Sequence, residues 1–198
     1  MFSLLYPSIY LTISFEKWLV SNGAIYPKLE LKDYGNEVRG CHSKEVIEND
    51  ETIITIPLNC LITVEMGKET EIGEAIIRSN IELDAPKHIF IMIFMLVDRK
   101  NPNSFFKPYY DILPPTLSNM PVFWTERERN YLTGSFLLTQ IDERNLAMEN
   151  DYSSICAVAP AFALIATLQD FKWARMCVCS RNFGLLVNGL RTAGTSAS

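Results

Sequence analysis

An unbroken run of apolar residues, Ile89 to Val97, constrains this 198-residue chain more than any other feature. Lys87-His88 precedes the run, and Asp98-Arg99-Lys100 follows it. Its length is about half of what a transmembrane helix needs, which is about 20 residues. The run is therefore predicted to be a helix buried in a protein core. Pro86 can occupy the first turn of that helix, with Asp84 as its N-cap.

Size, composition and charge indicate an ordinary globular chain. The length fits one domain, or one domain with an insertion. Hydrophobic residues make up 48% and charged residues 21% of the chain, a composition that does not indicate disorder. The net charge is −5 and no basic cluster is present, so nucleic-acid binding is not expected. The acidic balance is compatible with a basic protein substrate.

The cysteines argue against a disulfide framework and against a structural zinc site. They are odd in number and irregularly spaced, and no CxxC pair occurs among Cys41, Cys60, Cys156, Cys177 and Cys179. We expect reduced thiols, with Cys177 and Cys179 packing on a helix rather than binding a metal. The first residues have no basic segment or cleavage site typical of a secretory signal. An intracellular location, cytoplasmic or nuclear, without membrane contact, is therefore expected.

The first third of the chain reads as one short helix followed by strands. Ser14 is a natural N-cap, and Asn22-Gly23 is a natural end for the helix. Strands are predicted at Glu37–Cys41 and Glu51–Pro57, around a turn at residues 48–50. A third short strand is predicted at Leu61–Val64.

From Met66 onward the pattern is helical. Thr125-Glu126-Arg127-Glu128 is a capping box that predicts a helix through Leu132 and on to Leu138. Phe171, Ala174, Cys177 and Val178 recur at helical spacing, and that helix is predicted to close at Arg181-Asn182 and Gly184. A proline-rich aromatic connector runs from Pro102 to Pro115.

The segment from Phe171 to Gly184 resembles the one before the catalytic centre of SET-domain protein methyltransferases. The resemblance is to the Rubisco-lysine and actin-histidine methyltransferase group. Phe15-x-x-Trp18-Leu19-x-x-Asn22-Gly23-Ala24 is similar to the first helix of that family, and residues 102–109 are similar to its insertion. Together the similar segments cover about Phe15 to Ala193.

This resemblance implies an α+β fold: a partial SET domain with small antiparallel sheets and a large helical insertion. The division expected is an N-terminal segment at 1–13 and an incomplete SET domain at 14–193. The helical insertion would occupy residues 66–170, and residues 194–198 would form a disordered tail.

The resemblance also implies S-adenosyl-L-methionine as cofactor. Residues 38–41 match a glycine-x-glycine turn of the family, although Val38 stands where the first glycine usually is. Glu51 and Ile53 match positions that face the cofactor, and a solvated carboxylate at a strand edge is the alternative for Glu51. Arg181 resembles the arginine that approaches the methionine carboxylate, and the favourable helix dipole is its alternative explanation. The cofactor-binding residues implied by the resemblance are Arg39, Gly40, Cys41, Glu51, Ile53, Arg181, Asn182 and Phe183.

The implied activity is methylation of a lysine or histidine side chain in a protein, which requires no metal. The family continues into an Asn-His pair and a later tyrosine, and no Asn-His dipeptide occurs in this chain. No catalytic residue is therefore assigned. The expectation is a monomeric chain with residual cofactor affinity and no turnover. A non-catalytic fragment that binds a protein or peptide is the alternative, and the choice between lysine and histidine stays open.

Overall fold

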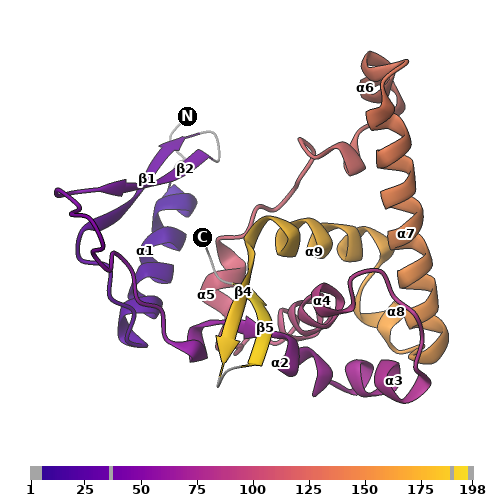
Figure 1. Ribbon diagram of the computed structural model, residues 1–198, viewed down its shortest axis with the longest axis horizontal. Helices are drawn as coiled ribbons and strands as arrows, with labels where there is room; N and C mark the ends of the chain where they lie inside the picture. Colours follow the sequence, from indigo (N-terminus) through magenta and orange to yellow (C-terminus); the bar gives the residue numbers. More distant parts are fainter. Residues whose placement is uncertain (1–5, 36–37, 188–189, 196–198) are drawn as a thin grey trace. The chain divides into compact units, whose positions relative to one another are not determined.

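The computed structural model describes residues 6–35, 38–187 and 190–195 (Figure 1). The chain divides into two compact units. The first comprises Met1–Leu61 and Pro102–Pro114, and the second comprises Ile62–Asn101 and Pro115–Ser198. The fold is α+β with small antiparallel sheets, as predicted. Within the described ranges, no helix has the length and apolar character needed to cross a membrane.

The first unit combines two helices with a β-hairpin and a turn of 3-10 helix. Its elements are α1 (Tyr6–Ser21), β1 (Leu29–Gly35), β2 (Val38–Ser43), η1 (Leu58–Cys60) and α5 (Lys107–Asp111). Aromatic rings join α1 to the segment before α5. The ring of Trp18 lies 5.3 Å from that of Phe105 and 6.1 Å from that of Phe106, between centroids. Phe15 packs beside Trp18 and is almost fully buried.

Helix α1 ends where the sequence predicts and begins earlier. Gly23 adopts the left-handed φ of 95°, and the Ala24 N–H donates to the Leu19 carbonyl at 3.0 Å. Ser14 is not the N-cap, because the helix already runs from Tyr6, with Pro7 in its first turn. Residues 6–13 are therefore part of a helix that continues into the expected domain, rather than a separate segment.

In the first unit, one strand prediction is right and one is wrong. β2 pairs antiparallel with β1, with Leu31 opposite Cys41 and Lys32 opposite Gly40. The sequence analysis did not predict β1. Glu51–Pro57 is not a strand: in the described part of the chain, its only pairing is an isolated bridge between Thr55 and Ile25. That bridge forms two backbone hydrogen bonds of 2.9 Å, and the neighbouring residues stay extended without a partner strand.

The second unit is mainly helical, with one three-stranded antiparallel sheet of order β3-β5-β4. Its first elements are β3 (Ile62–Thr63), α2 (Val64–Lys68), α3 (Glu71–Ser79), α4 (Pro86–Asp98), η2 (Pro121–Phe123) and α6 (Glu126–Arg129). The later ones are η3 (Asn130–Leu132), α7 (Phe136–Val158), α8 (Phe162–Ile165), α9 (Leu168–Arg181), β4 (Asn182–Val187) and β5 (Leu190–Thr195). The predicted third strand is confirmed as β3.

Helix α4 is the predicted core helix. Its residues Ile89, Ile91, Met92 and Ile93 are 0% exposed, and the helix packs against α2 and α9. Asp84 is not its N-cap. Ala85 occupies that position in a left-handed conformation, with Pro86 in the first turn. The Asp84 carboxylate instead forms a 2.6 Å ion pair with Arg175 of α9, and this partner is 91 residues away in sequence.

The capping box at Thr125 is confirmed, and the long helix predicted after it is interrupted. The Thr125 hydroxyl accepts a hydrogen bond from the Glu128 N–H, and the Glu128 carboxylate accepts one from the Thr125 N–H. Helix α6 then stops at Arg129, and Gly134 adopts a positive φ of 85°. Ser135 caps a new helix, α7, so the prediction of one continuous helix to Leu138 is wrong.

Strand β5 corrects the expectation of a disordered tail. Gly194 and Thr195 pair with Phe183 and Asn182 of β4, and on the other side with Thr63 and Ile62 of β3. These pairs rest on backbone hydrogen bonds, which small residues make as readily as apolar ones. Residues 196–198 lie outside the described residues.

We predict that Gly67→Ala destabilises the fold by about 3 kcal/mol or more, at the upper end of overpacking penalties. A Cβ atom at Gly67 would lie 1.8 Å from the Phe90 carbonyl oxygen, where α2 meets the backbone of α4. Gly134→Ala is the control: no neighbour lies within 4 Å of its Cβ position, so only the positive φ opposes alanine, at about 1–2 kcal/mol. Urea unfolding measures both changes, and equal losses of stability would contradict the close α2–α4 contact.

Candidate functional site

The end of α9 turns into a strand without an intervening loop. Arg181 is the last residue of the helix, and Asn182 is the first residue of β4. The Asn182 side-chain amide donates to the carbonyls of Val178 at 3.0 Å and Cys179 at 3.3 Å, which caps the helix. The helix thus closes at the predicted Arg181-Asn182 pair, whereas Gly184 lies within β4.

Arg181 and Phe183 lie at this junction between helix and strand. Arg181 is half-buried, and its Nη1 donates to the Ser180 hydroxyl at 2.7 Å. A guanidinium carries five N–H donors in a planar fork, a geometry that matches a carboxylate. Phe183 is 36% exposed and pairs with Gly194 of the sheet.

His88 is a polar group beside this junction that the sequence analysis did not single out. Its Nδ1 lies 3.8 Å from the Cys179 sulfur. Burial and the charge of Arg175 lower the pKa of His88, and a hydrogen bond with the Asn182 side chain and the charge of Asp84 oppose that shift. The balance favours the neutral imidazole. Its partners are about 90 residues away in sequence, so local patterns gave no signal for this contact.

The two neighbouring cysteines of α9 differ in environment. Cys177 is 0% exposed, and burial raises the pKa of its thiol to about 11. It is a packing residue, as predicted. Cys179 is exposed.

In the first unit, Gly40 lies in the middle of β2 beneath two aromatic rings. A Cβ atom there would lie 3.3 Å from Cε2 of Tyr34 and 3.6 Å from Nε2 of His42. The Tyr34 hydroxyl contacts the same His42 nitrogen. Cys41 points to the other face of the hairpin, since strand neighbours alternate. Cys41 and His42 therefore do not form a catalytic dyad.

Arg39 has a partner that the sequence could not indicate. Its guanidinium donates to the carbonyl of Ile112, the residue that follows α5. A cation at the carboxyl end of a helix is favoured by the helix dipole. The Arg39 side chain therefore ties the hairpin to α5 within the first unit.

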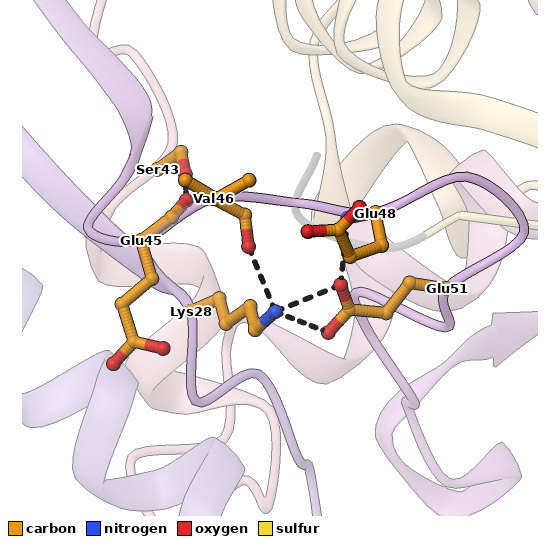
Figure 2. Close-up of polar contacts among 6 residues, drawn as sticks. All are labelled: Lys28, Ser43, Glu45, Val46, Glu48 and Glu51. Atoms are coloured by element: carbon orange, nitrogen blue, oxygen red, sulfur yellow. Dashed lines mark hydrogen bonds and ion pairs between the residues drawn. The ribbon is translucent and has the colours of Figure 1, made fainter.

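Glu51 is the centre of a polar cluster that fixes the loop after β2 (Figure 2). Lys28 Nζ lies 2.7 Å and 2.8 Å from the two carboxylate oxygens, and it also donates to the Val46 carbonyl at 2.8 Å. The Glu48 N–H donates to the same carboxylate at 2.9 Å. The hydrogen bond from Lys28 is the main cause that lowers the pKa of Glu51. The side chain of Glu51 thus anchors this loop while part of it stays exposed to solvent, and residue 51 does not belong to a strand.

The implied cofactor residues fall into two groups, one in each unit. The first unit holds Arg39, Gly40, Cys41, Glu51 and Ile53, and the second holds Arg181, Asn182 and Phe183. The Ile53 side chain is 37% exposed, in an extended segment outside the strands. The guanidinium of Arg181 has the geometry to bind a carboxylate such as that of S-adenosyl-L-methionine. The rings of Tyr34 and His42 cover the side of Gly40 that lacks a Cβ atom. The Glu51 carboxylate already accepts hydrogen bonds from Lys28 and from the Glu48 N–H, so these oxygens are engaged within the loop.

We predict that Lys28→Met opens the loop at residues 44–51. The Glu48 amide should exchange its hydrogen several-fold faster, because the Glu51 carboxylate loses the cation that positions it. Since the pKa of Glu51 is lowered from 4.5, the protection should be complete above that pH. It should disappear as the pH falls through the lowered value.

Hydrogen exchange read by mass spectrometry measures this effect, with Lys44→Met as the control. Lys44 is an exposed lysine of the same loop. Its backbone N–H donates to the Lys28 carbonyl, and a change of the Lys44 side chain leaves this hydrogen bond in place. Equal exchange in the two variants would show that Lys28 does not order the loop.

Comparison with known proteins identifies relatives of this chain. It is 27% identical over 173 residues to the actin-histidine N-methyltransferases of Gallus gallus and Homo sapiens. The aligned region is 83% of this chain and 29% of each relative, so the chain spans less than a third of their length. No protein-family model matches the chain.

Solved structures show the same fold. The SET domain of LSMT bound to lysine and AdoHcy superposes with a TM-score of 0.79 at 24% identity, over 95% of this chain and 42% of that one. Rubisco LSMT bound to sinefungin and monomethyllysine gives a TM-score of 0.73 at 26% identity, over 87% and 41% of the two chains. The chain is therefore a homologue of the actin-histidine N-methyltransferases, with the fold of the SET domain of Rubisco LSMT.

Proposed function

We propose that this chain serves S-adenosyl-L-methionine-dependent N-methylation of a lysine or histidine side chain in a protein. The observation that carries the proposal is the alignment with actin-histidine N-methyltransferases over 83% of the chain. The superposition on a SET domain bound to lysine and AdoHcy supports it at the level of the fold. The acceptor stays open between lysine and histidine, because the sequence relatives are actin-histidine N-methyltransferases, whereas the superposed SET domain is bound to lysine.

Arg181 is the residue whose chemistry fits the cofactor most directly. It would bind the carboxylate of the methionine part through parallel N–H donors. Gly40 would take part through its backbone groups, since the rings of Tyr34 and His42 cover the side that lacks a Cβ atom. Phe183 is exposed near the start of β4. The bound cofactor supplies an electrophilic methyl group.

The chain's contribution to the reaction would be positioning and the exclusion of water. Holding two reactants in line can supply about 7–11 kcal/mol of the barrier to such a transfer. We assign no proton-transferring residue, and the acceptor nitrogen must arrive unprotonated to use its lone pair.

An intracellular site of action, in cytoplasm or nucleus, belongs to the same proposal. All five cysteines are free, which agrees with a reducing compartment. A protein substrate is the partner proposed, by analogy with the relatives. The alternative, a peptide-binding fragment without methyl transfer, would bind its peptide equally well with and without S-adenosylhomocysteine.

We predict that the chain binds S-adenosylhomocysteine weakly and that Arg181→Ala weakens this binding by about 1.5–3 kcal/mol, as for a lost charged hydrogen bond. Isothermal titration up to millimolar ligand measures the affinity. Arg127→Ala is the control, because it removes the same charge from the exposed surface of α6.

Two results would contradict this assignment. One is equal affinity in the Arg181 and Arg127 variants. The other is a loss of thermal stability without ligand as large as the loss of binding, which would make Arg181 a structural cap of α9. Absence of binding by the unsubstituted chain at millimolar ligand would count against the proposed function itself.

A further inference from the structure

We propose that Cys179 is a reactive thiol, activated by His88, that is modified covalently by carbon electrophiles. The proposal rests on the side chains between the start of α4 and the end of α9, within the second unit. It does not depend on the methyltransferase proposal.

The geometry is that of a nucleophile beside a base. The Cys179 sulfur is exposed, and His88 Nδ1 lies 3.8 Å away, within the range of a hydrogen bond to sulfur. An adjacent base is the usual means by which a protein activates a thiol. The distance is long for a fully formed pair, and catalytic contacts are often long until a reactant binds.

A third side chain orients the imidazole. The interaction of the Asn182 side chain with His88 raises the pKa of the imidazole. The Asn182 amide also donates to the carbonyls of Val178 and Cys179. Asn182 therefore links the imidazole to the turn of helix that carries the thiol. A nucleophile, a base and a group that orients the base are the three parts expected of an activated nucleophile.

The surrounding charges favour a neutral base at physiological pH. His88 faces Arg175 of α9, whose charge opposes an imidazolium, and Asp84, which partly offsets Arg175 through their ion pair. Burial adds to the lowering of the His88 pKa. The imidazole nitrogen is thus available to accept the thiol proton as the sulfur attacks.

The covalent step balances without an oxidant. With iodoacetamide as the electrophile, the sulfur forms a bond to the methylene carbon while the carbon–iodine bond breaks and iodide leaves. The thiol proton passes to His88 Nδ1 and then to solvent. The product is a thioether at Cys179.

The other cysteines of the chain supply internal controls. Cys41 is exposed, lies on β2, and has its neighbour His42 on the opposite face. Cys177 and Cys60 are buried, and burial raises the pKa of both thiols. Cys41 therefore reports the reactivity of an exposed thiol without a base, and Cys177 reports whether the fold stays closed.

The test is the rate of alkylation of each cysteine in the 198-residue chain by iodoacetamide, read by peptide mass spectrometry. At pH 7 we expect Cys179 to react about tenfold faster than Cys41, a modest part of the 10²–10⁴ that general bases supply. The Cys179 rate should stay flat down to a pH of about 6.5, since His88 remains unprotonated there. The Cys41 rate should fall continuously as the pH is lowered, because the thiolate is the reactive form of a thiol without a base.

His88→Gln tests the role of the base, with His42→Gln as the matched control. The His88 variant should lower the Cys179 rate to that of Cys41 and give it the same pH dependence, while Cys177 stays unlabelled. The His42 variant should leave Cys179 unchanged. Equal rates and pH slopes for Cys179 and Cys41 in the unsubstituted chain would overturn the proposal. Fast, pH-independent labelling that persists in His88→Gln would overturn the role of His88.

Discussion

The burial of α4 is the constraint on which the rest of the second unit depends. A helix whose residues from Ile89 to Leu96 are almost all inaccessible to water must be covered on every side. Helices α2 and α9 provide much of that cover. The glycine in α2, Gly67, lets the two backbones approach so closely that the Phe90 carbonyl occupies the place of a Cβ atom. The position of α9 follows from this packing.

A polar network at the start of α4 sets how α9 and α7 meet it. Arg175 is 3% exposed, and it binds both the carboxylate and the backbone carbonyl of Asp84. The Asp84 N–H in turn donates to Asp151 of α7 at 2.9 Å. Burial is the main cause that raises the pKa of Asp151. Because a buried arginine needs a partner of opposite charge, this network fixes the segment before α4 to both helices.

Local signals in the sequence were sufficient for the elements that depend on local contacts. The apolar run gave α4, the Thr125 capping box gave the start of α6, and Asn22-Gly23 gave the end of α1. Strand β1 was missed although Leu29 and Leu31 alternate with charged residues, because glutamate, lysine and aspartate have low strand propensity and the strand depends on pairing with β2. The isoleucine-rich segment at 51–57 read as a strand although no second strand lies beside it in the described residues.

At the candidate site, too, the contacts between residues distant in sequence were the ones that could not be predicted. The resemblance to known methyltransferases pointed to Arg181, and the structure sets Arg181 at the junction of α9 and β4. Glu51 contacts Lys28, which is 23 residues away in sequence. Arg39 contacts Ile112, which is 73 residues away. The contact between His88 and Cys179 spans 91 residues. Such contacts are set by the packing of α4 and of the hairpin, and no pattern of neighbouring residues encodes them.

The most direct test of the cofactor assignment is an NMR titration of the ¹⁵N-labelled chain with S-adenosylhomocysteine. The amide signals of Arg181, Asn182 and Phe183, at the junction of α9 and β4, should shift with one common affinity. Signals from α6, such as that of Arg127, should not move. Unchanged signals at this junction, with or without shifts in other elements, would contradict the assignment of these residues to the cofactor.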